Sequence, residues 1–402
     1  MKDNQAKYPQ LRFKGLTDPW EQRKLGELGK IYTGNTPKTS DLDNWTDNKE
    51  GHIWITPTDI DKLIMSDSDR HLSEQGWSKA RKIPENSVLI TSIASIGKNT
   101  INAVPVAFNQ QINAIVPEKN DSYFILSAMI KDTARFASAA GQTATAIINK
   151  TTFEKFQIAT PSYEEQQKIG SFFKQLDNTI TLHQRKLAKL KELKQGYLQK
   201  LFPKNGSKFP QLRFAGFADA WEQCKFSELY KKNLERNKDQ FSSDRTISIA
   251  TMRFKEEGNG AAENSLVSYK VLREGDIAFE GHTSKQFAFG RFVLNDIGDG
   301  IMSPRFTTLR PTQDMPIKFW KQYIHYEPIM RYPIVNSTKL GTMMNELVVD
   351  EFLNQPVLVP ALSEQQKIGS FFKQLDDTIA LHQRKLEKLQ ELKKGYLQKM
   401  FC

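Results

Sequence analysis

The sequence predicts an α+β protein in which two pseudo-two-fold-related, mixed α/β domains are joined by two long helices packed as an antiparallel coiled coil. Three observations support this prediction. Glu165–Phe202 and Glu364–Phe401 are nearly identical and differ at only six positions. A shorter segment is also repeated, and the blocks between the repeats share little sequence. An internal repeat constrains the architecture before any single element is considered.

Each long segment is expected to form one helix of about 55 Å, at ~1.5 Å per residue. Apolar residues recur at alternating spacings of four and three, which is a heptad seam, although His183 and Lys194 interrupt it. Ser162-x-x-Glu165 and Ser363-x-x-Gln366, each after a proline, mark the helix starts. Two separate helices, each lying on its own domain, are the alternative arrangement. The residues predicted to pack the helix pair are Ile169, Phe173, Leu176, Ile180, His183, Leu187, Leu190 and Tyr197, and Ile368, Phe372, Leu375, Ile379, His382, Leu386, Leu389 and Tyr396.

A shorter strip precedes each block. Lys7–Leu28 and Lys208–Leu229 are identical at 14 of 22 aligned positions. The chain is therefore divided into a strip with the first domain (1–160), the first helix (161–203), a strip with the second domain (204–359) and the second helix (360–402). A duplicated chain usually folds with approximate two-fold symmetry, as a dimer does. By that symmetry the first strip is expected near Phe401, so that the two ends of the chain are neighbours.

The blocks between the repeats, of about 130 residues each, are long enough to bury independent cores. β-Branched and aromatic residues predict strands, and longer apolar segments predict helices. In the first block the expected strands are Ile53–Ile60, Ser87–Ile93 and Ala103–Phe108, with a helix over Ser122–Ala140. In the second block the expected strands are Thr246–Thr251, Ser268–Leu272, Asp276–Glu280 and Arg291–Leu294, with a helix over Pro316–Arg331.

The composition is that of a globular protein with a basic balance. The formal net charge of +11 favours a polyanionic partner, nucleic acid first, although a basic surface without a partner is the alternative. No apolar run approaches the ~20 residues of a membrane helix, and the N-terminus lacks the apolar core of a signal peptide. Cys224 and Cys402 form no disulfide framework, so a cytoplasmic location is expected.

The motifs of cofactor-dependent and metal-dependent enzymes are missing from the sequence. Gly97-Lys98 lacks the upstream glycine and the following Ser or Thr of a P-loop. No GxGxxG follows a strand, and neither HExxH nor Cys/His pairs at zinc spacing occur. The Asn/Asp-Pro-Pro-aromatic motif of an amino-methyltransferase is absent. His183 and His382 are interpreted as packed histidines at equivalent seam positions, and no metal site is expected.

Polar loops in both blocks contain the residue types that contact nucleic acids. Asn, Gln, Arg and Lys bind base edges, and Ser, Thr and backbone N–H groups hold phosphates. For each loop an ordinary surface turn is the alternative, and the basic C-terminal halves of the helices are interpreted as solvated faces. The predicted DNA-binding residues are Thr36, Lys38, Thr39, Ser92, Lys98, Gln110, Gln142, Thr143 and Lys150 in the first block, and His282, Ser284, Lys285, Gln286, Arg291, Arg305, Lys339 and Thr342 in the second.

The whole pattern resembles the specificity subunit of type I restriction–modification systems, and the resemblance covers essentially the whole chain. It is carried by the EQQKIGSFF helix entries after Pro161 and Pro360, by the WEQ-containing strips, by IWITPTDI at Ile53–Ile60 and by FNQQINAI at Phe108–Ile115. The second block lacks the WITP and NQ signatures.

This resemblance implies a non-catalytic subunit. Each block would be a target recognition domain that binds one half of a bipartite, non-palindromic sequence in double-stranded DNA. The coiled coil would hold the two domains apart and inverted. Two methylation subunits with S-adenosylmethionine would dock on the chain, and restriction subunits with ATP and Mg²⁺ would complete the nuclease. No cofactor is expected in the chain itself.

Two other functions remain open at this point. A coiled-coil scaffold could join two partner-binding domains without any contact to DNA. Alternatively, the chain could itself be a DNA nuclease or methyltransferase, which the missing cofactor motifs disfavour. Sequence-dependent DNA binding would exclude the scaffold, and methyl transfer by the isolated chain would establish the enzyme.

Overall fold

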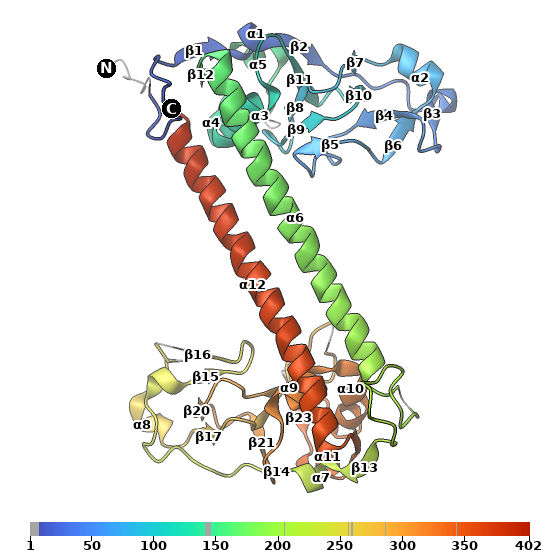
Figure 1. The fold of residues 1–402 in the computed structure, drawn as a ribbon, viewed down its shortest axis with the longest axis vertical. Coiled ribbons are helices and arrows are strands. Elements are labelled where there is room, and N and C mark those ends of the chain that lie inside the picture. Colours follow the sequence, from blue (N-terminus) through green and yellow to red (C-terminus); the bar gives the residue numbers. More distant parts are fainter. Residues whose placement is uncertain are drawn as a thin grey trace. The chain divides into compact units, whose positions relative to one another are not determined.

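The computed structural model describes residues 8–140, 146–204, 206–255, 257–258, 260–285, 287–342 and 344–402. The chain divides into two compact units (Figure 1). The first unit comprises Met1–Gln184 and Arg384–Cys402, and the second comprises Arg185–Gln383. Each unit therefore contains one globular block, the beginning of one long helix and the end of the other.

The two long helices are α6 (Tyr163–Leu201) and α12 (Leu362–Met400), each of 39 residues. The first helix begins directly after Ser162, the predicted cap. The second begins at Leu362, so Ala361 precedes it and the predicted cap Ser363 lies inside its first turn. At the start of α6 the Glu165 amide donates to Ser162 Oγ at 3.4 Å. A glutamine side chain in the first turn of each helix donates to the carbonyl of the preceding proline: Gln166 to Pro161 at 3.1 Å, and Gln365 to Pro360 at 2.9 Å.

Within each unit the helices pack in opposite directions. In the first unit, Phe172 near the start of α6 meets Tyr396 near the end of α12, edge to face, with ring centroids 5.0 Å apart. In the second unit, Tyr197 near the end of α6 meets Phe371 in the same way at 4.9 Å. These contacts confirm the antiparallel pair and exclude separate helices. All the predicted packing residues are buried or partly buried.

An aspartate on each long helix binds both the facing long helix and a helix of the adjacent block. The apolar pattern of the sequence does not predict these contacts. Asp177 of α6 accepts from Tyr123 at 2.9 Å and forms an ion pair with Lys393 of α12 at 2.6 Å. The equivalent Asp376 of α12 accepts from Gln322 at 2.9 Å and pairs with Lys194 of α6 at 2.7 Å. The lysine that interrupts the predicted seam therefore forms an ion pair with the facing helix.

The globular block of the first unit contains two five-stranded sheets, ordered β2-β11-β8-β9-β5 and β3-β6-β4-β10-β7. In both sheets the neighbouring strands are mostly antiparallel, and β5/β9 and β4/β10 are parallel. A separate pair joins β1 of the strip to β12. The strands are β1 (Glu21–Lys24), β2 (Gly29–Thr33), β3 (Trp45–Thr46), β4 (His52–Ile55), β5 (Ile64–Met65), β6 (Arg70–Leu72), β7 (Lys82–Ile83), β8 (Val88–Thr91), β9 (Asn99–Asn102), β10 (Val106–Phe108), β11 (Ile112–Pro117) and β12 (Gln157–Thr160). The helices are α1 (Leu25–Leu28), α2 (Glu74–Lys79), α3 (Ser122–Lys131), α4 (Thr133–Ser138) and α5 (Lys150–Lys155), with a 3₁₀ turn at Leu42–Asn44.

The second unit repeats one of these sheets as the antiparallel order β14-β21-β18-β19, and β13 of its strip pairs with β24. Three further two-stranded pairs lie among the described residues of this block. The strands are β13 (Glu222–Lys225), β14 (Tyr230–Lys232), β15 (Ile247–Ser248), β16 (Arg253–Phe254), β17 (Lys270–Leu272), β18 (Ile277–Glu280), β19 (Arg291–Leu294), β20 (Gly300–Met302), β21 (Thr307–Pro311), β22 (Thr338–Lys339), β23 (Glu346–Leu347) and β24 (Pro356–Val359). The helices are α7 (Phe226–Leu229), α8 (Glu263–Leu266), α9 (Ile317–His325), α10 (Glu327–Val335) and α11 (Val349–Leu353), with a 3₁₀ turn at Ser243–Arg245.

Several predicted elements are shorter than expected. The strand expected over Ile53–Ile60 ends at Ile55, because the Thr56 amide donates to the Asp59 carboxylate at 2.7 Å and turns the chain. The helix expected over Ser122–Ala140 is divided at Asp132 into α3 and α4. The helix expected over Pro316–Arg331 is likewise divided at Tyr326, immediately before Glu327 and Pro328 begin α10. Pro328 lies in the first turn of the second piece, where a proline is tolerated.

The end of each long helix completes the core of the unit in which it lies. Met400 and Phe401 pack in the first core with Trp20 of the strip and Phe124 of α3. In the second core, Leu201 and Phe202 pack with Trp221 and Phe319. The first strip therefore lies at the end of the second helix, as the symmetry predicts (Figure 1).

Backbone and ionic contacts hold each strip to both helices of its unit. The Leu11 amide donates to the Lys399 carbonyl at 2.8 Å, and the equivalent Leu212 amide donates to Lys200 at 2.9 Å. Arg12 forms two hydrogen bonds with Glu165, a glutamate at the start of α6 whose side chain is 1% exposed. Arg213 and Glu364 repeat this bidentate pair in the second unit. Such paired geometry is the strong form of an ion pair.

Among the residues described, no helix is long and apolar enough to cross a membrane. In the same part of the chain, no three or more His, Cys, Asp and Glu side chains are grouped so that they could hold a metal ion.

We predict that Phe401→Ala destabilises the first unit by about 3–5 kcal/mol, because it removes a buried ring and leaves a cavity. Hydrogen exchange of β8 and α3 measures this change. The second unit, followed at β18 and α9, should be unaffected. Phe202→Ala is the matched variant, with the opposite pattern expected. Equal losses of protection in both units from either variant would contradict the assignment of each helix end to one core.

Candidate nucleic-acid interface

Equivalent loops lie at the same end of the strands in one sheet of each unit, and this end is called the edge below. The order β2-β11-β8-β9 in the first unit corresponds to β14-β21-β18-β19 in the second. The described residues at that edge are those between β8 and β9 or between β18 and β19, those immediately before α5 or α11, and the turn before β11 or β21. We call this set of loops the loop edge of each unit.

In the first unit, hydrogen bonds join the loop after β8 to the loop before α5. The Ile148 amide donates to the Ser92 carbonyl at 2.9 Å, and Ile93 and Ile147 form an isolated antiparallel bridge. The side chain of Asn113 on β11 donates to Ser92 Oγ at 2.7 Å. These bonds bring together two loops that the sequence places about fifty residues apart, and they hold Ser92 in a buried position, 3% exposed.

In the second unit, the corresponding loops are joined in the same manner. The Asn345 amide donates to the Gly281 carbonyl at 2.8 Å, and the Asn345 side chain donates to Ala288 at 3.1 Å. The side-chain oxygen of Asn345 also accepts from the Gly341 amide at 3.2 Å. A buried asparagine therefore fastens two predicted DNA-binding loops to each other.

Most of the predicted DNA-binding residues are exposed. Arg291 is partly buried, since it donates to Glu280 at 2.7 Å. Lys150 pairs with Glu154 at 3.5 Å, and Ser284 Oγ accepts from the Phe287 amide at 3.0 Å. Contact of these residues with DNA stays a prediction. Those exposed are Lys38, Thr39, Lys98, Gln110, Lys150, His282, Ser284, Lys285, Arg305, Lys339 and Thr342; Thr36 is partly buried; and Gln142, Thr143 and Gln286 lie outside the described residues.

The prediction of site residues did not include the asparagines that shape the loops. Asn35 donates to the Lys79 carbonyl at 3.0 Å, and its own side-chain oxygen accepts from the Arg81 amide. Asn109 accepts from the Gln111 amide at 2.7 Å. Asn113 and Asn345 join neighbouring loops. Asparagine in a polar loop is a turn signal, but its partner on another loop depends on the tertiary fold.

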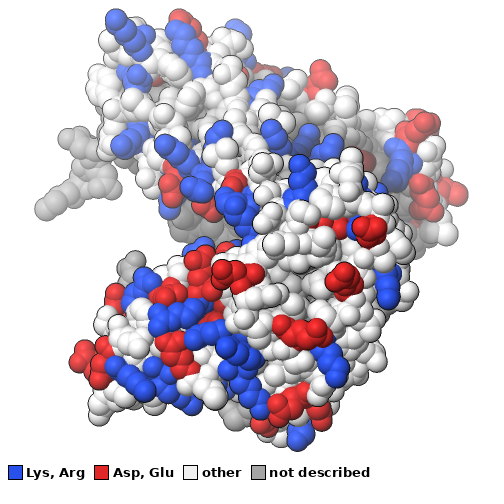
Figure 2. Space-filling model, turned by 60° about the horizontal axis from the view of Figure 1, so that its bottom comes forward, with Lys and Arg blue, Asp and Glu red and all other residues white. Residues whose placement is uncertain are grey.

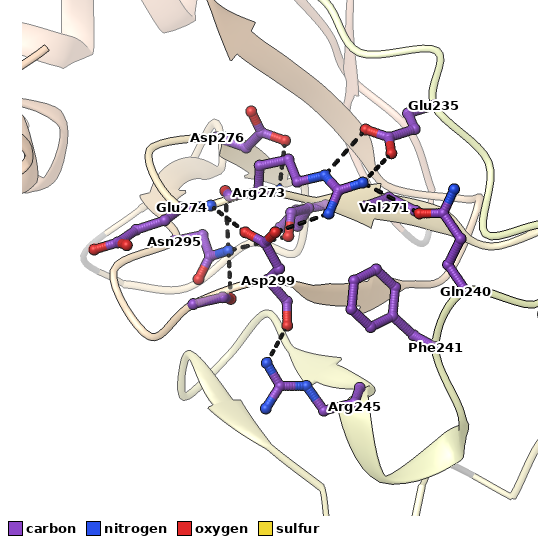
Figure 3. A network of polar contacts seen from close by, with 12 residues as sticks. Glu235, Gln240, Phe241, Arg245, Val271, Arg273, Glu274, Asp276, Asn295 and Asp299 are labelled. Atoms are coloured by element: carbon purple, nitrogen blue, oxygen red, sulfur yellow. Dashed lines mark hydrogen bonds and ion pairs between the residues drawn. The ribbon is translucent and has the colours of Figure 1, made fainter. Parts of the chain in front are cut away.

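Two arginines of the second unit, Arg273 (Figure 3) and Arg310, are occupied by internal ion pairs. Arg273 pairs with Glu235 and, at 2.8 Å, with Asp299. Arg310 pairs with Glu235 and, at 2.8 Å, with the fully buried Asp276. Burial alone would raise the pKa of Glu235, but the hydrogen bonds from Arg273 and Arg310 outweigh it and hold the pKa below its usual value. These arginines therefore stabilise the block and are not free to bind phosphate.

On the face shown in Figure 2, the surface charge is mixed rather than concentrated in one patch. Lys and Arg side chains are interspersed with Asp and Glu on the face shown in Figure 2. Many basic residues have carboxylate partners nearby, including Lys168 with Glu164 and Lys373 with Asp377. The net charge of +11 thus acts as a diffuse attraction for a polyanion, while discrimination between bases requires the loop residues.

A family model described as the type I restriction modification DNA specificity domain matches the chain twice, at residues 17–192 and 220–391. The chain is 31% identical over 185 residues to the type I restriction enzyme EcoR124I/EcoR124II specificity subunit of Escherichia coli, covering 42% of this chain and 44% of the relative. It is 22% identical over 408 residues to the MjaIX specificity subunit of Methanocaldococcus jannaschii, covering 95% and 92%. The match to the Escherichia coli relative thus spans less than half of that protein.

The fold is similar to that of a solved structure, the crystal structure of a type I restriction-modification system S subunit from M. genitalium. The TM-score is 0.64 at 14% sequence identity, and the alignment covers 98% of this chain and 99% of that chain. A second similar chain comes from a structure of complex assembly and conformational transition in the type I R-M system, with a TM-score of 0.51 at 14% identity and coverage of 97% and 99%.

We predict that Glu235→Gln lowers the free energy of unfolding by about 2 kcal/mol at pH 7, because it weakens charge-assisted hydrogen bonds to two arginines. The folded-state pKa of Glu235 is lowered, so its contribution is present above the unfolded pKa of about 4.3 and is lost as the pH falls through the folded value. The difference between variant and parent should therefore shrink toward acid pH.

Urea unfolding at pH 7, 5, 4 and 3 measures this difference. Glu263→Gln, at an exposed glutamate of the same unit, is the control and should change little. A difference that stays constant across this range, or grows toward acid pH, would contradict the role of the ionised carboxylate.

Proposed function

Because the chain belongs to the family of type I restriction modification DNA specificity domains, we propose that it binds double-stranded DNA at a bipartite target, with each globular block binding one half. The chain is a specificity subunit and not a catalytic subunit, since both halves match the specificity-domain model and the relatives carry that name. The observation that supports the proposal most directly is the equivalent loop edge in each unit.

The two loop edges share a framework and differ in their side chains. The framework bond from Ile148 to Ser92 in the first unit corresponds to the bond from Asn345 to Gly281 in the second. The exposed groups on these frameworks are unlike, with Gln110 and Lys98 in one and His282, Lys285 and Arg305 in the other. Unlike side chains select unlike base sequences, so the two half-sites should differ and the complete target should be non-palindromic.

The partners follow from the repeated helices. The long helices are nearly identical in sequence, so they present nearly the same surface twice, which suits two copies of one partner. We assign that partner as a methylation subunit, which would bring S-adenosylmethionine, and we expect restriction subunits with ATP and Mg²⁺ to complete the enzyme. The chain itself would need no cofactor. A DNA-associated assembly of this kind would operate in the cytoplasm.

A scaffold that binds two proteins without contacting DNA is the competing function. If the chain were such a scaffold, changing the exposed amide and basic groups of the loop edges would not alter which DNA bases are selected. Base selectivity is therefore the property to measure.

We predict that methylated adenine occurs at one split, non-palindromic motif in cells that carry this chain with its neighbouring methylation subunit. Long-read methylation mapping gives the motif, and deletion of this chain should abolish it. Exchange of residues 29–160 for another first block should change one half of the motif and leave the other half intact. Methylation that persists after the deletion would refute the proposed function and favour the scaffold.

A further inference from the structure

The turn before β11 presents one exposed side chain on a rigid support. Asn109 accepts from the Ile112 amide at 3.1 Å through its carbonyl and from the Gln111 amide at 2.7 Å through its side chain. The Asn109 amide donates to the Ile55 carbonyl at 2.8 Å. Gln110 lies between these anchored residues and is exposed. The turn therefore holds the backbone of Gln110 while its amide group faces solvent.

The segment after β2 supports this turn from the side. The Asn35 amide donates to the Phe108 carbonyl at 2.9 Å, and the Gly34 amide donates to the Ile112 carbonyl at 3.2 Å. A Cβ atom at Gly34 would lie 2.2 Å from the Phe108 carbonyl oxygen and 2.3 Å from that of Asn109. Only glycine permits this close approach of the two backbones, which places Thr36 beside Gln110.

Thr36 determines which way the Gln110 amide faces. Its hydroxyl donates to Gln110 Oε1 and accepts from Asn109 Nδ2 at 3.4 Å. Within the described residues, the Gln110 Nε2 group has no hydrogen-bond partner. An amide oxygen has two lone pairs, so Oε1 can accept one more hydrogen bond. The exposed amide thus offers a donor and an acceptor side by side in a fixed order, which matches N7 and N6 of adenine in the major groove.

The second unit presents a different group at the corresponding turn. The turn before β21 is held by the bond from the Phe306 amide to Ser303 at 3.3 Å and by the Lys270 ammonium group, which donates to the Phe306 carbonyl at 2.7 Å. Arg305 lies in this turn and is exposed. Unlike Arg273, Arg291 and Arg310, it has no carboxylate partner among the residues that the structure describes. Its guanidinium group is therefore free to donate two parallel hydrogen bonds.

We propose that these equivalent turns read one purine in each half-site, Gln110 reading adenine and Arg305 reading guanine. The inference rests on the proposed DNA-binding function and names two specificity-determining residues within it. Arginine donates to both O6 and N7 of guanine, and glutamine pairs with N6 and N7 of adenine. Thr36 acts as a positioning residue, because it orients the Gln110 amide without being required to touch DNA.

A structural role for the Thr36–Gln110 hydrogen bond is the competing explanation. In that case, loss of the bond would loosen the turn and lower stability while leaving base preference unchanged. Base preference at a single position therefore distinguishes the two explanations, because a merely structural bond would not move it.

Methylation mapping with the full chain and its methylation subunit tests the proposal in three variants. Gln110→Ala should relax one adenine position in the half-site of the first block by about tenfold or more. Thr36→Val should relax the same position to a smaller extent, with a thermal melting temperature close to that of the parent. Arg305→Ala should relax one guanine position in the other half-site.

Matched controls are available on exposed side chains of the same units. Gln75→Ala in the first unit and Arg331→Ala, whose arginine pairs with Glu327, in the second should leave the motif unchanged. A parental motif that all three test variants retain, or relaxation at a base of another kind, would overturn this inference. A parent without any motif dependent on this chain would instead refute the proposed function.

Discussion

The packing of each helix end into a core formed mainly by another part of the sequence is the interaction on which the structure depends. Phe401, near the last residue of the chain, lies against Trp20 and Phe124 of the first unit. Phe202 lies against Trp221 and Phe319 in the second. Neither core is complete with its own half of the chain alone, so each globular block depends on the helix contributed by the other half.

Ionic and polar contacts make this packing specific. An apolar seam alone would tolerate several registers between two nearly identical helices. Asp177 and Asp376 each bind both the facing helix and a helix of the adjacent block. The pairs Arg12–Glu165 and Arg213–Glu364 hold the strips to the helix starts. Removing one member of such a buried pair leaves an uncompensated charge, which penalises alternative registers. The framework is thus selected by polar contacts and stabilised by apolar ones.

The loop edges are supported differently from this shared frame. Their backbones continue from the ends of the sheet strands. Asparagines such as Asn113 and Asn345 hold them by donating hydrogen bonds to a loop hydroxyl and a loop carbonyl. Exposed residues such as Gln110 and Arg305 contribute little to those networks. Side chains of this kind can differ between the two units without disturbing either core, which is the requirement for two unlike recognition surfaces on one frame. Loops on a rigid scaffold commonly carry function for this reason.

The sequence by itself determined the duplicated order, the two long helices and the heptad seam. These properties follow from the spacing of apolar residues and from the near identity of Glu165–Phe202 and Glu364–Phe401. Both can be seen in the single sequence without a structure. The seam identified packing residues that are all buried or partly buried. The symmetry of the repeats gave the position of the first strip beside Phe401. Loop residues such as Gln110 and Arg305 could be named as candidates by type alone.

Only the tertiary structure decided how those candidates are held. The bond from Thr36 to Gln110 joins residues 74 positions apart, and Asn345 meets Ala288 across 57. Ser92 is buried and accepts a hydrogen bond from Asn113. Arg273 and Arg310 form ion pairs with carboxylates that lie elsewhere in the sequence. No local pattern records such partners, because strand pairing brings them together only after the chain has folded. The sequence could therefore name groups capable of binding DNA, and the fold determined which of them are exposed, oriented and free.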